Sequence, residues 1–356
     1  MFGIKQTGWI GIDIGTATVK LAQLSRSNNK PRLTGLAMVP RRAAWRIAEL
    51  AEQTLSSNDE ICAAVSLHPG FQGKLAAITP PMALCKVHTL DRTKTHDPSD
   101  ERFVRAAIEL ATQRSADQLQ FDTWDAEPEP EGRAPRRANV LTVATHWADQ
   151  FFDDLRLSGW SCQAIDGLPL ALARAVAMVQ PKDSTAPVAA LDWGFAEATL
   201  CIVLAGNPVY VRSLKACGLN RLLDKLVESL DVTTEEAQRL LHEQGVLGHS
   251  TSSPTSIQEL IEEIIADPLA QLISEYQRTV SHLQCQRRSI VPKRLVLFGG
   301  GATINGIAEQ LTATLETKTT IWSPGQELAG PINSTGLPGC LFGPAIALSA
   351  LAWEKA

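Results

Sequence analysis

Residues 9–24 read WIGIDIGTATVKLAQL and residues 188–204 read VAALDWGFAEATLCIVL, and these two stretches decide the fold. In the first, an apolar run ends at Asp13, a turn containing Gly15 follows, and a second alternating strand leads away. The second stretch repeats this layout with Asp192 and Gly194. Both are typical of β-hairpins that carry an acid and a glycine at the turn. Because the two acids lie 179 positions apart (192 minus 13), we expect two related α/β domains that each open with this hairpin.

A third stretch, RLVLFGGGA at residues 294–302, joins an apolar strand to a helix through three glycines. Glycine lets a backbone approach a ligand closely, and a helix N-terminus attracts anions. A strand, a glycine turn and a helix in this order therefore indicate a ligand-binding loop.

The three turns together predict one binding site. Backbone N–H groups at the hairpin turns suit phosphate oxygens, and the glycine loop suits a nucleoside. A single Asp-x-Gly hairpin is weak evidence, because turns carry these residues for conformational reasons. The candidate binding residues are Asp13, Gly15, Thr16, Ala17, Asp192, Gly194, Gly299, Gly300, Gly301 and Ala302. Asp13 and Asp192 are also the candidates to hold Mg²⁺ through water.

The composition excludes several classes of function. The chain of 356 residues is 44% hydrophobic and 20% charged, as in soluble globular proteins. A net charge of −5 gives no basic surface for nucleic acid. The seven cysteines are scattered without CxxC spacing, which indicates free thiols and no metal site built from protein ligands alone. There is no signal peptide and no apolar run of about 18 residues, so we expect a cytoplasmic protein without direct membrane insertion.

The domain organisation follows from these patterns. We expect a first domain over residues 1–186 and a second over 187–356, joined by the polar, proline-rich segment 180–187. A helix is expected over residues 165–179. In the second domain, Asp267-Pro268 is expected to separate two helices, because proline favours the first helical position. An apolar helix at about 343–354 is expected to pack back on the first domain.

Several segments resemble a known family. GIDIGTATVK (residues 11–20) resembles the first phosphate loop of the actin and sugar-kinase superfamily, and LFGGGATINGIAEQL (297–311) resembles its adenosine loop. Three further segments resemble the PilM family of the type IV pilus inner-membrane platform: QAIDGLPLALARAV (163–176), RSLKACGLNRLLDKL (212–226) and SEYQRTVSHLQCQ (274–286). The resemblance implies an actin-like, FtsA-like fold of two α/β domains. It also implies a small α+β insert of the SHS2 type at about residues 79–145, which we expect to sit on the first domain only.

The resemblance also implies partners and a cofactor. PilM proteins bind the short cytoplasmic tail of the membrane protein PilN beside the insert. We therefore expect a PilN-like tail as partner, contacts with other pilus platform proteins, and a homo-oligomer. The implied cofactor is ATP with Mg²⁺, and the implied location is cytoplasmic, peripheral to the inner membrane through a partner.

The sequence departs from the family at three places. Phe195, Ala196 and Glu197 follow the second Asp-x-Gly, where relatives carry small, hydroxylated residues. Leu168 stands where active relatives carry a glutamate, and Leu241 where relatives carry a lysine that contacts adenosine. These departures predict a partly degraded nucleotide pocket with weak or absent ATPase activity.

Two alternative functions stay open. One is a GspL-like subunit of a type II secretion platform, although that family continues into a transmembrane helix and this sequence ends at Ala356. The other is an active ATPase or phosphotransferase of the same superfamily, although no segment identifies itself as a catalytic aspartate in a substrate cleft.

Overall fold

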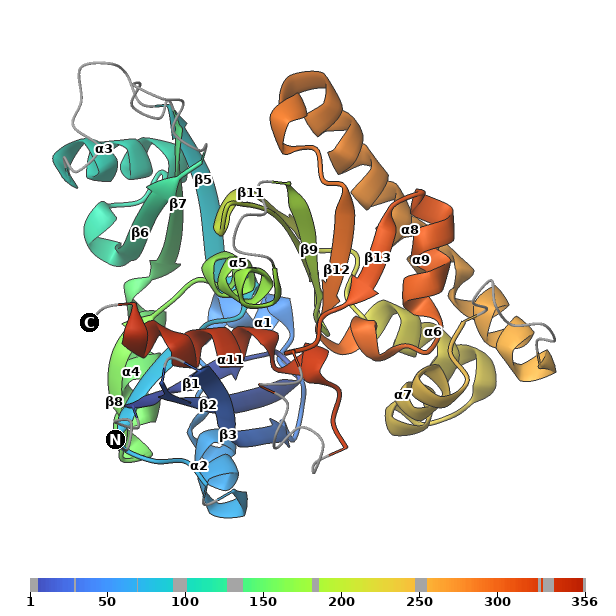
Figure 1. Cartoon of the computed structure of the whole chain (residues 1–356), viewed down its shortest axis with the longest axis horizontal. Helices are drawn as coiled ribbons and strands as arrows, with labels where there is room; N and C mark the ends of the chain where they lie inside the picture. The colour runs from blue at the N-terminus through green and yellow to red at the C-terminus, as the bar shows by residue number, and fades with distance from the viewer. Residues whose placement is uncertain are drawn as a thin grey trace.

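The strands of the first half form a five-stranded sheet in the order β3-β2-β1-β4-β8 (Figure 1). This computed structural model describes residues 6–28, 30–68, 70–91, 101–126, 137–180, 186–246, 255–325, 328 and 336–354. β1, β2 and β3 are antiparallel, whereas β4 runs parallel to β1 and β8 parallel to β4. The bounds are β1 (Gln6–Ile14), β2 (Thr18–Ser27), β3 (Lys30–Pro40), β4 (Leu75–Thr79) and β8 (Ser161–Ile165), with helices α1 (Ile47–Glu52), α2 (Asn58–Leu67) and α4 (Thr145–Leu157).

The second half repeats this sheet. Its order is β11-β10-β9-β12-β13, again with three antiparallel strands followed by two parallel ones. The repeat explains why the same hairpin opens both halves. The bounds are β9 (Val188–Trp193), β10 (Ala198–Leu204), β11 (Asn207–Leu214), β12 (Arg294–Phe298) and β13 (Lys318–Ile321), with helices α6 (Asn220–Leu230), α7 (Thr234–Glu243), α8 (Ser256–Gln286) and α9 (Ile307–Leu315).

Two helices cross between the sheets. α5 (Leu168–Val179) packs on β9, β10 and β11, whereas α11 (Gly343–Ala350) packs on β1, β2, β4 and α5. Each half therefore sends one helix onto the other half's sheet (Figure 1). Gly11 of β1 permits the close approach of α11, because a Cβ there would lie 2.0 Å from the carbonyl oxygen of Ala345.

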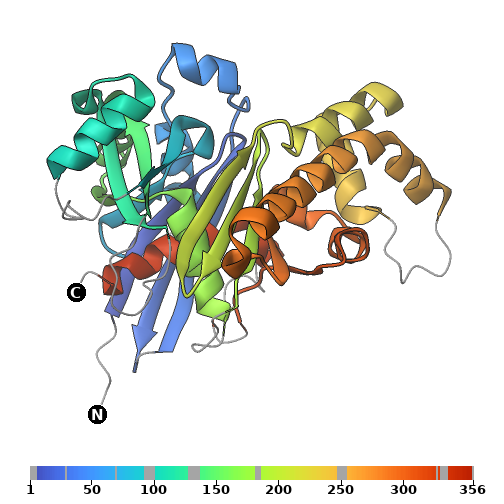
Figure 2. The ribbon, with the colours of Figure 1, turned by 90° about the horizontal axis from the view of Figure 1, so that it is seen from above.

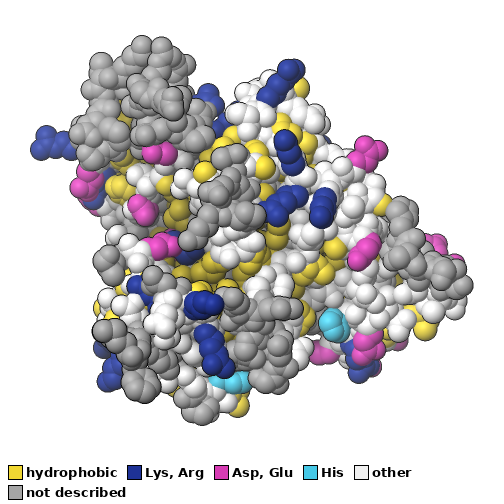
Figure 3. All heavy atoms as spheres, in the orientation of Figure 1, with side chains coloured by type: hydrophobic (Ala, Val, Ile, Leu, Met, Phe, Trp, Pro, Cys, Tyr) yellow, Lys and Arg dark blue, Asp and Glu magenta, His cyan; other side chains and the backbone are white. Residues whose placement is uncertain are grey.

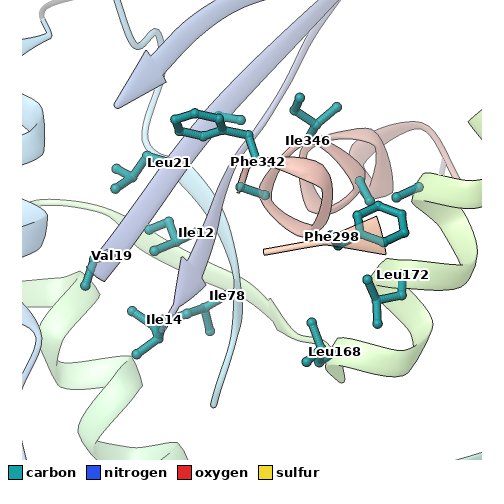
Figure 4. Close-up of a cluster of buried hydrophobic side chains, with 14 of the residues drawn as sticks. Ile12, Ile14, Val19, Leu21, Ile78, Leu168, Leu172, Phe298, Phe342 and Ile346 are labelled. Atoms are coloured by element: carbon teal, nitrogen blue, oxygen red, sulfur yellow. The ribbon is translucent and has the colours of Figure 1, made fainter. Parts of the chain in front are cut away.

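One hydrophobic core spans both halves. Figure 4 shows Phe298 from the end of β12 beside Leu172 of α5 and near Ile346 of α11. All three side chains are fully buried, and the same cluster continues to Ile12 of β1. Burying apolar surface on this scale is the main force that stabilises a fold. The indole nitrogen of Trp322 adds a hydrogen bond of 2.9 Å to the carbonyl oxygen of Ala175.

The insert has the order strand, helix, strand, strand. It consists of β5 (Cys85–Asp91), α3 (Glu101–Thr112), β6 (Leu119–Asp125) and β7 (Arg137–Ala144), with sheet order β5-β7-β6. Figure 2 shows it on the opposite side of the molecule from α8. The insert also contacts the second half. The Trp124 indole and the Asn139 amide both donate to the carbonyl oxygen of Pro208, at 2.7 and 3.2 Å.

Two expected helix boundaries are wrong. α8 continues unbroken through Pro268, because Ile265, Leu269 and Leu272 are buried on one face of it and this packing outweighs the hydrogen bond that proline omits. Ile165 ends β8 and does not begin α5, which starts at Leu168. Residues 181–185 of the expected linker lie outside the described part of the chain.

The described helices include none that is long and apolar enough to cross a membrane. On the face drawn in Figure 3, described Lys and Arg side chains are scattered around a central band of hydrophobic side chains.

Candidate functional site

The first hairpin turn is held by its own backbone and by an ion pair. Gly15 N–H donates to the carbonyl oxygen of Thr18 at 2.9 Å, which closes the turn between β1 and β2. The register places Asp13 opposite Lys20, and the Lys20 Nζ lies 2.9 Å from the Asp13 Oδ2. Burial alone would lower the pKa of Lys20, but the charges of Asp13 and Asp192 outweigh it and raise that pKa above its usual value. Lys20 therefore keeps its positive charge inside the cleft.

The second turn faces the first. Its register places Asp192 opposite Thr199 in the same way that Asp13 lies opposite Lys20. Burial and, after it, the charge of Asp13 raise the pKa of Asp192 to about 7, and Lys20 opposes the shift. Asp13, Lys20 and Asp192 line the same cavity, so the two hairpins meet there.

Strand β12 brings the glycine loop next to the second hairpin turn. β12 runs parallel to β9 and pairs Phe298 with Asp192, so Gly299 follows directly beside that carboxylate. Gly299 has a φ of 78°, and a Cβ there would lie 2.7 Å from the Asp192 Oδ1. Only glycine meets both conditions without strain.

The three turns line one cavity of about 430 Å³ between the halves. This volume lies within the range of small-molecule sites. Eight of the ten predicted residues line it: Asp13, Gly15, Thr16, Ala17, Asp192, Gly194, Gly299 and Gly300. Gly301 and Ala302 do not. A Cβ at Gly301 would lie 2.1 Å from the Trp193 ring, so this glycine accommodates a buried indole.

Arg41 is a cavity residue that the sequence analysis missed. Its Nε donates to the carbonyl oxygen of Gly15 at 3.0 Å, and its Nη2 donates to the Ser57 Oγ at 2.9 Å. Its Nη1 lies 3.2 Å from the Glu60 Oε2, and the guanidinium carbon lies 3.5 Å from the centre of the Trp45 ring. Burial lowers the pKa of Arg41 to about 10, and Glu60 opposes that shift. Arg41 therefore stays charged at neutral pH and braces the first turn.

Not all of the residues that depart from the family pattern lie at the cavity. Leu168, Phe195, Ala196 and Glu197 all line the cavity. Leu241 does not, because it is buried in the hydrophobic core of the second half. Our interpretation of Leu241 as a residue at the adenosine position is therefore wrong. Thr234, Glu235 and Gln238, in the first half of α7, line the cavity in its place.

The arrangement suits a phosphate-containing ligand. The backbone N–H groups of Thr16, Ala17, Phe195 and Ala196 have no hydrogen-bond acceptor among the described residues. Free N–H groups in a turn form an anion-binding concavity, and Lys20 adds a positive charge. The donor set for Mg²⁺ is small, because the described residues contain no cluster of three His, Cys, Asp or Glu side chains that could hold a metal. Two carboxylates fit Mg²⁺ only together with water and phosphate oxygens.

Comparisons with known proteins agree with one another. A family model described as "Type IV pilus assembly protein PilM" matches residues 11–334. The fold is similar to that in the "PilM-PilN type IV pilus biogenesis complex", with a TM-score of 0.78 and 19% identity over 97% of this chain and 98% of that chain. A search of curated protein sequences finds no match.

Two further solved structures are similar at a greater distance. Ethanolamine utilization protein EutJ from Carboxydothermus hydrogenoformans has a TM-score of 0.51 and 12% identity over 96% of this chain and 89% of that chain. MreB 5 of Spiroplasma citri bound to AMPPNP has a TM-score of 0.49 and 12% identity over 93% and 95%. The predicted fold class, an actin-like α/β fold of two domains, is confirmed.

Proposed function

Because the chain belongs to the type IV pilus assembly protein PilM family, we propose that it is an actin-like scaffold of the pilus inner-membrane platform. Its partner is the cytoplasmic tail of a PilN-like membrane protein, which holds it at the inner membrane. The observation that supports this best is the family match over residues 11–334, together with a shared fold along 97% of the chain with the protein from a PilM–PilN complex. Contacts with other platform proteins and self-association belong to the same proposal.

The tail docks at the junction between the first sheet and the insert. Each sheet has an edge strand there: β8 is an edge strand of the first sheet, and β6 is an edge strand of the insert. α4 contacts both of them, so the two edges lie near one another. An extended peptide can add to such an edge and place side chains in neighbouring pockets. Ile165, at the end of β8, is 37% exposed and supplies an apolar contact.

The cavity binds a nucleotide as a conformational ligand. Its phosphates occupy the space between the two hairpin turns, close to Lys20, and its nucleoside lies against Gly299 and Gly300. Asp13 and Asp192 would hold Mg²⁺ through water, and the metal would neutralise phosphate charge.

Hydrolysis is weak or absent in this proposal. Leu168 lines the cavity at the start of α5 and offers no hydrogen bond to a water molecule. A group that positions water contributes about two to four orders of magnitude in rate. We expect ATP turnover far below about 1 s⁻¹, the lower end of ordinary enzymes. Turnover near that value in the purified protein would favour the alternative of an active ATPase.

A combined variant tests the same residues. Leu168→Glu with Phe195→Ala and Glu197→Thr should bind nucleotide more tightly than the wild type, because it removes bulk and charge from the phosphate space. Tryptophan fluorescence during urea unfolding would check that this variant folds. Equal or weaker nucleotide binding by a folded variant would argue against the pocket assignment.

A co-purification experiment tests the scaffold role. The wild-type chain, immobilised, should retain a PilN-like protein from the same organism and should lose that protein when its cytoplasmic tail is deleted. Retention of a type II secretion membrane protein, with no retention of any pilus protein, would favour the GspL-like alternative.

A further inference from the structure

The two hairpins differ at one equivalent position. Thr18 follows Gly15 by three residues in the first turn, and Glu197 follows Gly194 by three residues in the second. The matching register of the hairpins makes these two positions counterparts, and both line the cavity. One turn therefore presents a hydroxyl group to the cavity, and the other presents a carboxylate.

Glu197 is buried, and only one of its two carboxylate oxygens has a hydrogen-bond partner among the described residues. The residue is 8% exposed, and its Oε2 accepts a hydrogen bond from the Ser213 hydroxyl. The other oxygen, Oε1, is buried and has no hydrogen-bond partner among the described residues. Burial raises the pKa of Glu197, while Ser213 and Lys215 lower it. A buried acceptor without a donor favours a ligand that donates there and disfavours an anion.

Glu197 lies in the turn between β9 and β10 and lines the cavity. Pro80, Pro81 and Met82 of the first half line the same cavity, and the charge of Glu197 contributes, after burial, to the raised pKa of the Cys85 thiol. The nucleoside side is different, because Gly300 and the α7 residues Thr234 and Gln238 belong to the second half. In the binding mode that we propose, with the base at α7 and the phosphates between the turns, the last phosphate approaches the turn that carries Glu197.

We propose that Glu197 makes this cavity selective for a nucleoside diphosphate over the corresponding triphosphate. The inference rests on the proposed nucleotide pocket and names its ligand class. Two phosphates use the free N–H groups of the two turns and the Lys20 charge. A third phosphate brings a further negative charge to a buried carboxyl group that Ser213 and Lys215 balance only in part, because its Oε1 has no hydrogen-bond partner among the described residues. Like charges brought together in this way weaken binding by about tenfold or more.

Calorimetric titration of ADP and ATP into the full chain tests the proposal. The wild type should bind ADP at least about tenfold more tightly than ATP. Glu197→Gln keeps the side-chain shape, and Glu197→Thr copies the first hairpin. In both variants the preference should fall to about threefold or less, through tighter ATP binding, with ADP affinity nearly constant. Glu235→Gln removes a carboxylate that lines the same cavity from α7, and it should keep the tenfold preference.

The outcomes separate the two proposals. Equal affinity of the wild type for ADP and ATP, or a preference that survives Glu197→Gln, overturns the role of Glu197 and leaves the pocket standing. A preference that Glu235→Gln also abolishes overturns it as well, because the effect would then reflect general charge. If neither nucleotide binds the folded wild type or its variants, the nucleotide pocket itself is refuted.

Discussion

Replacing Asp192 with asparagine should remove a loss of folding stability that occurs as pH rises and the buried Asp192 carboxyl ionises. The pKa of Asp192 is raised from 3.8 to about 7, first by burial and then by the charge of Asp13. The folded protein therefore keeps this proton between about pH 4 and pH 7, whereas the unfolded chain releases it. The free energy of unfolding consequently falls as pH rises through that window, and the loss is complete above about pH 7.

The size of the stability loss follows from the pKa shift of Asp192. Three pKa units correspond to about 4 kcal/mol, since each unit is worth about 1.4 kcal/mol. The carboxyl lies on the wall of a cavity and is not fully enclosed, so solvent reduces this value. We expect a net effect of about 1–3 kcal/mol. Asparagine has the same shape and never ionises, so the variant should escape the loss.

Urea unfolding at pH 5 and pH 8 measures this loss of stability. The free energy of unfolding of Asp192→Asn, relative to the wild type, should be higher at pH 8 than at pH 5 by about 1–3 kcal/mol. Asp224→Asn, at an exposed position of α6, serves as the control and should show no such change. If the difference between Asp192→Asn and the wild type is the same at both pH values, Asp192 does not hold its proton and the reasoning is refuted.

Two further variants probe the walls of the cleft. Gly301→Ala should lower the free energy of unfolding by about 2–4 kcal/mol, because its Cβ would lie 2.1 Å from the Trp193 ring. Gly325→Ala, with no atom within 4 Å of the added Cβ, should change it little, and equal urea midpoints for the two would contradict this account. Arg41→Lys should lower the free energy of unfolding by about 1–3 kcal/mol, because a lysine cannot reproduce the fork of hydrogen bonds and the contact with Glu60. A thermal midpoint for Arg41→Lys equal to that of the wild type would show that Arg41 does not brace the turn.

Much of the site was predictable because it lies in hairpins. Asp13 and Asp192 each precede a glycine turn, and the repeat of that pattern predicted that the turns face one ligand. Lys20 was also within reach, because a turn closed between Gly15 and Thr18 places position 20 opposite position 13. Its place in the cavity follows only when the register of the hairpin is extended from the turn to position 20.

Other features depend on packing that a sequence does not display. Arg41 enters the cavity from the segment after β3, and nothing in its neighbours marks it. The third glycine of the loop, Gly301, is required by the Trp193 ring, which is distant in sequence. The orientation of Leu241 could have been found, since the capping box at Thr233 fixes the start of α7 and places Ala237 and Leu241 on one face. The contact of the insert with Pro208 joins segments too far apart for any local pattern.

Calorimetric titration with the tail peptide tests the central claim most directly. The probe is a synthetic peptide with the cytoplasmic sequence of a PilN-like protein from the same organism. The account predicts saturable one-to-one binding to the wild type. Ile165→Asp, at the end of edge strand β8, should weaken it at least about tenfold, the effect expected for losing an anchoring contact. Ile321→Asp changes an isoleucine that is 45% exposed, against 37% for Ile165, at the end of edge strand β13, and it should leave the affinity within about twofold. The absence of binding to the wild type, for this tail and for every other tail encoded with the pilus proteins, would contradict the account.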